Sequence, residues 1–148
     1  MPKNSYIFPL PIGSDTDICT LFSHFAEEEG AILLDSANCG GEDSRFDIFS
    51  ANPVATVYQK ENITYVSYRD GEKGVAVNDD ALSMVQRLLN KFITPVEGSH
   101  LPFTCGALGF IAYDYKNQLE TLKDKAADDM TLDTLRIGIY DWCVIKDN

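Results

Sequence analysis

A polar cluster where two predicted strands meet is the stretch of the chain whose side chains most favour ligand binding. Ser36 follows a predicted strand at 31–35, and Ser44 and Arg45 directly precede a second strand that starts at Phe46. A strand end, a flexible loop and a strand start place these polar side chains at one rim. Two hydroxyls and a guanidinium beside an aromatic ring can hold a carboxylate and an apolar body, as an amino acid presents them.

A structural ion pair is the alternative interpretation of Arg45. Asp43 and Asp47 flank this residue, and either carboxylate can pair with the guanidinium around the turn. Composition alone favours such an ion pair over a ligand site. Both interpretations stay open when only residue types are considered.

No other group of residues forms a catalytic or metal-binding pattern. His24 and His100, the two histidines, are far apart in the chain and lack metal-ligand spacing. Helix capping explains the acidic run Asp15-Thr16-Asp17 better than a bound cation does. The four cysteines lack CxxC spacing, which favours reduced thiols over a zinc site. We therefore predict no catalytic residue and no metal site in this chain.

Composition excludes several classes of function. The chain has 148 residues, which fits a single domain over 1–148. With a formal net charge of −11, it lacks the Lys and Arg clusters that bind nucleic acids and anionic membranes. No apolar run approaches the roughly 20 residues that span a bilayer, and no export signal follows Met1. The sequence therefore predicts a cytoplasmic protein that binds neither nucleic acid nor membrane.

Apolar periodicity predicts about seven strands and two or three helices. An N-terminal edge strand at 6–10 precedes a helix that Ser14 caps and that stops before Gly30. A second helix starts at 78–80, with Leu82 in its apolar stripe. The other predicted elements are strands at 31–35, 46–50, 54–59, 63–69, 103–113 and 135–145, a three-residue hairpin loop at 60–62 and a short helix at 116–122. The strands are mostly contiguous, so the predicted class is α+β with an antiparallel sheet.

The last predicted strand runs to within three residues of Asn148. A strand of that length with nothing after it is an exposed edge. The final Lys-Asp-Asn is typical of the start of a hairpin turn. We therefore expect the chain to be the front part of a longer protein.

Three blocks of sequence occur in an order and spacing that indicate a family. They lie at 33–53, 101–115 and 137–142, within roughly residues 30 to 148. Together they resemble the N-terminal region of the chorismate-utilising enzymes. The Ser-Arg-Phe-Asp string at 44–47 and the Tyr-Asp-Trp string at 140–142 favour the aminodeoxychorismate synthase branch of this family over the anthranilate synthase branch.

This resemblance implies a fold and a chemistry. The fold would be an antiparallel β-sandwich-like sheet flanked by two or three helices, in agreement with the strand pattern. The longer enzymes of this branch convert chorismate and ammonia to 4-amino-4-deoxychorismate, on the way to p-aminobenzoate and folate. They require Mg²⁺ and receive ammonia from a glutamine amidotransferase subunit. Their catalytic and metal-binding residues lie in the C-terminal half and match no position here, so we expect this chain alone to be inactive and without a cofactor.

The resemblance also implies a tryptophan pocket that coincides with the polar cluster. The matching positions are Ser36, Asp43, Ser44, Arg45 and Phe46, which we call the rim site. Asp43 departs from the family pattern, because an aromatic residue there would suit a tryptophan ligand. Its carboxylate repels the carboxylate of the ligand unless it pairs with the ammonium. In the family, a short piece of the C-terminal half closes this pocket.

Two alternatives to the aminodeoxychorismate branch stay open. The chain can be the N-terminal domain of an anthranilate synthase, an enzyme of tryptophan biosynthesis that tryptophan inhibits. It can also be a free-standing regulatory module that binds an aromatic amino acid.

Overall fold

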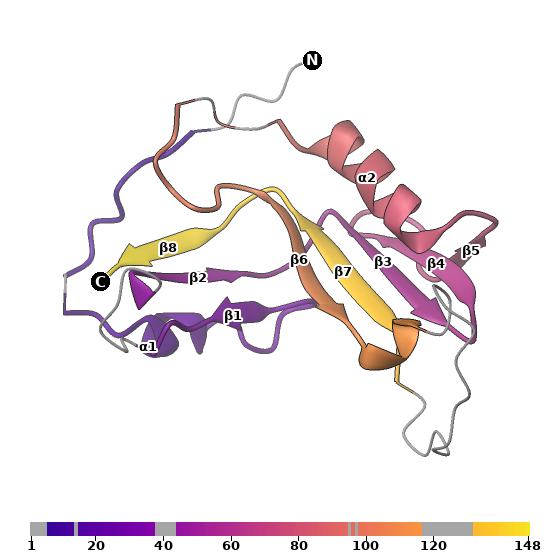
Figure 1. The fold of residues 1–148 in the computed structure, drawn as a ribbon. Helices are drawn as coiled ribbons and strands as arrows, with labels where there is room; N and C mark the ends of the chain where they lie inside the picture. Colours follow the sequence, from indigo (N-terminus) through magenta and orange to yellow (C-terminus); the bar gives the residue numbers. More distant parts are fainter. Residues whose placement is uncertain (1–5, 14, 38–43, 95, 97, 117–131) are drawn as a thin grey trace.

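Two antiparallel sheets and a few helices make up the computed structural model, which describes residues 6–13, 15–37, 44–94, 96, 98–116 and 132–148 (Figure 1). The predicted class, a mixed α and β fold with antiparallel pairing, is confirmed. None of the helices in these described ranges has both the length and the apolar character that crossing a bilayer requires.

The strands divide between a small and a larger sheet. The three-stranded sheet has the order β1-β2-β8, and the five-stranded sheet has the order β5-β4-β3-β7-β6. Every pair of neighbouring strands is antiparallel. The bounds are β1 Ile32–Leu34, β2 Phe46–Ser50, β3 Ala55–Lys60, β4 Ile63–Tyr68, β5 Val75–Val77, β6 Gly106–Ile111, β7 Leu135–Tyr140 and β8 Val144–Asp147.

The β3–β4 hairpin confirms the predicted pair of strands and shortens their loop. Lys60 pairs with Ile63 across the hairpin, so the turn has two residues, Glu61 and Asn62, instead of three. Both have positive φ, at 50° and 62°, as a two-residue turn that matches the twist of the strands requires. The short β5 strand, at Val75–Val77, was not among the predicted elements.

Helix α2, at Ala81–Phe92, packs against the five-stranded sheet and forms the main core with it. Its N-cap is Asp80, whose carboxylate accepts a hydrogen bond from the Ser83 backbone N–H at 2.8 Å. Leu82, predicted to face the core, is 42 % exposed. The buried face is therefore rotated from the predicted stripe and consists of Ala81, Met84, Val85 and Leu88.

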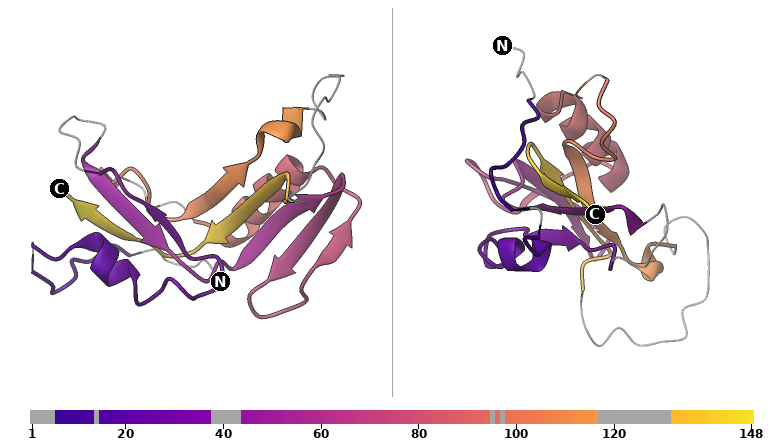
Figure 2. Two further views of the ribbon diagram at one scale, coloured as in Figure 1. Left: turned by 90° about the horizontal axis from the view of Figure 1, so that it is seen from below. Right: turned by 90° about the vertical axis from the view of Figure 1, so that its left-hand side faces the viewer.

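The predicted strand at 135–145 is wrong, because the chain changes sheets within it. β7 belongs to the five-stranded sheet and β8 to the three-stranded one. The break lies at 141–143, where Asp141 binds Arg69 and the Trp142 carbonyl accepts a hydrogen bond from Ser50. Those contacts replace strand pairing at the bend. Figure 2 shows the two sheets diverging from this region like the arms of a V.

The N-terminal predictions are wrong in two respects. Residues 6–10 form no strand, because Pro9 and the following Pro11 lack the N–H groups that a ladder needs. Helix α1 covers only Ile18–Phe22, and its N-cap is Asp17. Ser14, the predicted cap, lies outside the described residues.

Aromatic side chains join the segment after α1 to the three-stranded sheet. The ring of Phe25 lies 5.4 Å from that of Phe49 and 5.7 Å from that of Trp142. Phe49 is fully buried. This second, aromatic core holds Phe25 without the longer helix that the apolar stripe predicts.

The segment around β6 is shorter than the predicted strand. The strand predicted at 103–113 is confirmed only over Gly106–Ile111, and a 3₁₀ turn, η2, follows at Tyr113–Tyr115. The helix predicted at 116–122 lies, beyond Lys116, outside the described residues.

Candidate functional site

The rim site lies at the end of the three-stranded sheet where β1 ends and β2 begins. Ser36 stands two residues after β1, and its backbone N–H donates a hydrogen bond of 2.8 Å to Asp47 Oδ1. Its hydroxyl lies 2.6 Å from the same oxygen and 3.0 Å from the carbonyl of Ser44. The structure therefore brings Ser36 and Ser44 together, as the sequence predicts.

Asp47 anchors this end of the sheet. Only 5 % of the residue is exposed, and Asn148 Nδ2 donates to its second oxygen at 2.8 Å. Burial alone raises the pKa of this carboxyl, but the hydrogen bonds from Ser36 and Asn148 outweigh burial and lower the pKa. Asp47 is thus ionised and fully engaged inside the site.

Arg45 forms a two-point ion pair with Asp147, which the sequence did not predict. Its Nε and Nη2 donate to the two carboxylate oxygens, each at 2.6 Å. The hydrogen bond and the charge of each partner raise the pKa of Arg45 and lower the pKa of Asp147. Both side chains are about half exposed, so water screens this pair.

The aromatic contact at the site comes from Phe46. The Arg45 guanidinium carbon lies 4.7 Å from the centroid of this ring, within the range of a cation–π contact. Ser36, Ser44, Arg45 and Phe46 therefore lie at one sheet end. Asp43, the fifth rim residue, lies outside the described residues.

The local alternative is an ion pair of Arg45 with Asp47 or with Asp43. The pair with Asp47 is wrong, and Asp43 lies outside the described residues. The Asp47 oxygens are taken by Ser36 and Asn148, and the partner of Arg45 is 102 positions away along the chain. Asp147 and Asn148 are the site residues that sequence reasoning missed. The Lys-Asp-Asn string at 146–148 predicts the start of a turn, whereas Asp147 is the last residue of β8 and pairs with Phe46.

The arrangement suits binding better than catalysis. Hydroxyls, a guanidinium, carboxylates and an aromatic ring can recognise a zwitterion with an apolar side chain. Within the described ranges, no group of three or more His, Cys, Asp or Glu residues is placed to hold a metal ion.

Sequence comparison relates the chain to two kinds of synthase. It is 37 % identical over 128 residues to aminodeoxychorismate synthase component 1 of Escherichia coli K12, covering 86 % of this chain and 28 % of that protein. Against the protein of the same name from Klebsiella aerogenes the identity is 36 % over the same shares. Anthranilate synthase component 1 of Acetivibrio thermocellus is 28 % identical over 155 residues, covering 100 % of this chain and 30 % of that protein.

Structural comparison gives the same fold. The anthranilate synthase component I of Streptococcus pneumoniae TIGR4 superposes with a TM-score of 0.58 and 23 % identity, covering 70 % of this chain and 22 % of that one. No family model matches the chain. The chain therefore spans less than a third of the length of these relatives.

These comparisons confirm the predicted resemblance. The chain is similar in sequence to synthases of the chorismate-utilising class, and it shares the fold of the anthranilate synthase component I. Within that class, the relatives with the higher identities are aminodeoxychorismate synthases, component 1. The names of these relatives describe each of them as component 1 of its synthase.

Proposed function

We propose that this chain is the N-terminal part of an aminodeoxychorismate synthase component I. The observation that carries the proposal is the 37 % identity over 86 % of the chain, set against 28 % for the anthranilate synthase of Acetivibrio thermocellus. The Ser-Arg-Phe-Asp and Tyr-Asp-Trp strings support the same branch.

The activity belongs to the longer protein. That protein converts chorismate and ammonia to 4-amino-4-deoxychorismate for p-aminobenzoate and folate synthesis in the cytoplasm. It uses Mg²⁺, and a glutamine amidotransferase subunit supplies the ammonia. The chain contributes the N-terminal sheets and has no catalytic role of its own. With chorismate, ammonia and Mg²⁺, the chain alone therefore produces no aminodeoxychorismate.

A domain exchange tests this proposal. The matching N-terminal region of the Escherichia coli aminodeoxychorismate synthase component 1 is replaced by residues 1–148, and p-aminobenzoate-independent growth is measured. The same exchange is made in an anthranilate synthase component 1, with tryptophan-independent growth as the measurement. We expect growth only from the first chimera. Growth from the second alone would assign the chain to the anthranilate branch, the alternative that the full-chain match to anthranilate synthase keeps in view.

The rim site is proposed to bind L-tryptophan. The carboxylate of the tryptophan would accept the hydrogen bonds that Arg45 now donates to Asp147. The ammonium of the tryptophan would pair with the released Asp147 or with Asp43. The indole would pack beside Phe46, with the hydroxyls of Ser36 and Ser44 at the polar end. The two-point pair of Arg45 and Asp147 supports this proposal, because it presents both charges that a zwitterion needs.

A free-standing amino-acid-binding module is the second candidate. The same rim geometry supports it, because the four described rim residues all belong to this chain. The two candidates differ in the domain exchange. A module that only senses an amino acid would bind tryptophan and leave both chimeras inactive.

A further inference from the structure

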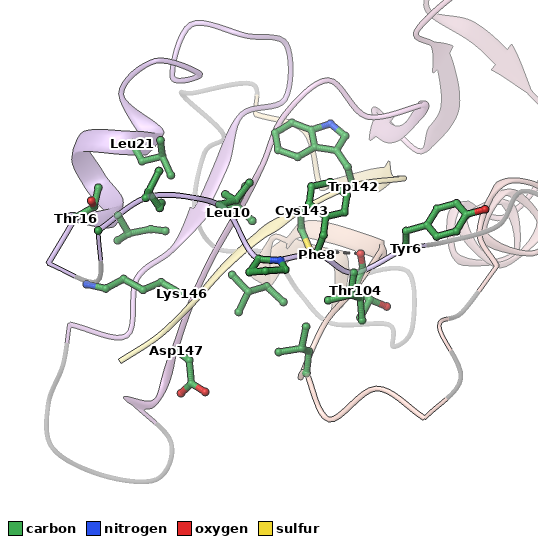
Figure 3. Close-up of a pocket in the computed structure, with 18 of the residues that line it drawn as sticks. Tyr6, Phe8, Leu10, Thr16, Leu21, Thr104, Trp142, Cys143, Lys146 and Asp147 are labelled. Carbon is green, nitrogen blue, oxygen red and sulfur yellow. Dashed lines mark hydrogen bonds between the residues drawn. The ribbon is translucent and has the colours of Figure 1, made fainter.

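A large apolar cavity lies between the N-terminal segment and β8. Its volume is about 750 Å³, within the roughly 300–1,000 Å³ typical of small-molecule sites. Residues 6–13, the start of α1, the loop around Thr104 and the segment 142–147 form its walls (Figure 3). None of the four described rim-site residues lines it, but Asp147, the ion-pair partner of Arg45, does. The cavity therefore adjoins the rim site at Asp147.

The wall is mostly apolar, with aliphatic and aromatic side chains. Leucine and isoleucine side chains from four parts of the chain meet there, among them Leu10, Ile18, Leu101 and Ile145. Leu10 is 42 % exposed, although it faces this apolar space. Covering such surface releases roughly 25 cal/mol for each Å² removed from water. Binding of an apolar ligand in the cavity is therefore favourable.

Lys146 supplies a positive charge at the wall of the cavity, where Asp17 and Asp147 are the acidic lining residues. Its charge acts on Asp17 and on Asp47 without direct contact. Asp17 caps α1, Asp47 is held by the hydrogen bonds described above, and Asp147 is held by Arg45. Across the described part of the chain, Lys146 forms no ion pair within 4 Å. Figure 3 shows the side chains of Lys146 and Asp147 pointing away from each other on β8.

We propose that this cavity binds a free aliphatic carboxylate. The acyl chain lies among the aliphatic side chains, and the carboxylate accepts a charge-assisted hydrogen bond from Lys146 Nζ. Desolvation of the chain provides the affinity, and the ammonium selects an acid over a neutral or cationic molecule of the same length. The inference rests on the cavity and Lys146. It does not require the proposed tryptophan site, although Asp147 belongs to both places.

Trp142 makes the proposal directly measurable. It lines the cavity and is the one tryptophan of the chain, so its fluorescence reports occupancy. The chain is titrated with decanoate, decanamide and decylammonium below their aggregation concentrations. We expect a saturable change with decanoate and at least about tenfold weaker binding of decanamide and decylammonium, a difference of ~1.4 kcal/mol.

Two variants distinguish the contribution of the Lys146 charge from that of the cavity volume. Lys146→Gln is expected to weaken decanoate binding about tenfold while leaving the affinity for decanamide unchanged, which also shows that the variant is folded. Lys60→Gln, at the far end of β3, serves as the matched control and keeps the affinity for decanoate. Thr104→Phe fills part of the cavity and is expected to weaken all three probes together.

Three results would overturn the proposal. Equal affinity for decanoate and decanamide would show that the cavity does not recognise a carboxylate. Tighter binding of decylammonium would show that it prefers a cation to an anion. An unchanged Trp142 fluorescence with every probe would show that the cavity does not take an aliphatic ligand. Loss of tryptophan binding at the rim site with intact decanoate binding would affect only the proposed function.

Discussion

Asp47 determines the geometry of the rim site. Its buried carboxylate ties together the end of β1, through Ser36, and the end of β8, through Asn148. Arg45, the residue whose chemistry first indicates a ligand, lies on the outside of this arrangement and holds Asp147 in solvent. The buried acid therefore shapes the site, and the exposed ion pair is available to exchange partners.

Asp47→Asn is expected to lower the free energy of unfolding by about 1–3 kcal/mol. The new amide keeps an acceptor for Ser36 but turns its NH₂ group toward the donating amide of Asn148, so one buried hydrogen bond is lost. Urea denaturation at pH 7 measures the effect. Asp114→Asn, at an exposed acid, is the matched control, and an equal loss in both variants would contradict the structural role of Asp47.

The pH dependence follows from the lowered pKa of Asp47. A carboxyl whose pKa is lower in the folded state stabilises that state above its unfolded pKa of about 3.9 and loses this contribution as the pH falls through the folded value. We therefore expect the difference in unfolding free energy between the native chain and Asp47→Asn to shrink between pH 5 and pH 2. A difference that stays constant over this range would show that Asp47 does not titrate with folding.

At the scale of elements, the bend between β7 and β8 is the main feature of the fold. Arg69 binds both oxygens of Asp141, at 3.2 and 2.9 Å, and also donates to the carbonyl of Asn52 at 2.8 Å. The two segments that pass between the sheets are thereby held by one guanidinium. Hydrogen bonding to Asp141 raises the pKa of Arg69, so the Arg69 guanidinium stays protonated.

Arg69→Gln is expected to cost about 1–3 kcal/mol of unfolding free energy, because Asp141 loses its ionic partner and the carbonyl of Asn52 a donor. Urea denaturation gives the value. Arg87→Gln serves as the control, since the exposed Arg87 of α2 pairs with Asp79 just before the helix and away from the bend. A loss no larger than that of the control would show that the bend does not depend on Arg69.

Local elements were predictable and the joins between them were not. The β3–β4 hairpin and α2 follow from alternation and capping within a dozen residues. The switch of the chain from β7 to β8 leaves no local signal, because residues 135–145 are continuously apolar apart from Arg136 and Asp141. The lack of a local signal also explains why only part of the rim site could be predicted. Ser36 and Ser44 are eight positions apart in the sequence, whereas the pair of Arg45 and Asp147 depends on the pairing of β2 with β8.

At the scale of the whole molecule, the two sheets diverge from the bend at 141–143 (Figure 2), and β8 contributes to both the rim site and the cavity. The rim site meets the C-terminal end of β8, and the apolar cavity lies along the segment 142–147. The aromatic core around Phe49 and the main core under α2 support the two arms separately. The rim site is therefore carried by the smaller sheet, and its serines, Arg45 and Phe46 need no contribution from the larger one.

Calorimetric titration of the chain with L-tryptophan most directly tests whether the rim site is an amino-acid site. We expect saturable heat with L-tryptophan, weaker binding of L-tyrosine, and at least about tenfold weaker tryptophan binding in Arg45→Gln, equal to ~1.4 kcal/mol. Arg87→Gln is expected to bind as the native chain does. Absence of saturable heat from the folded chain, or unchanged affinity in Arg45→Gln, would contradict the proposed site.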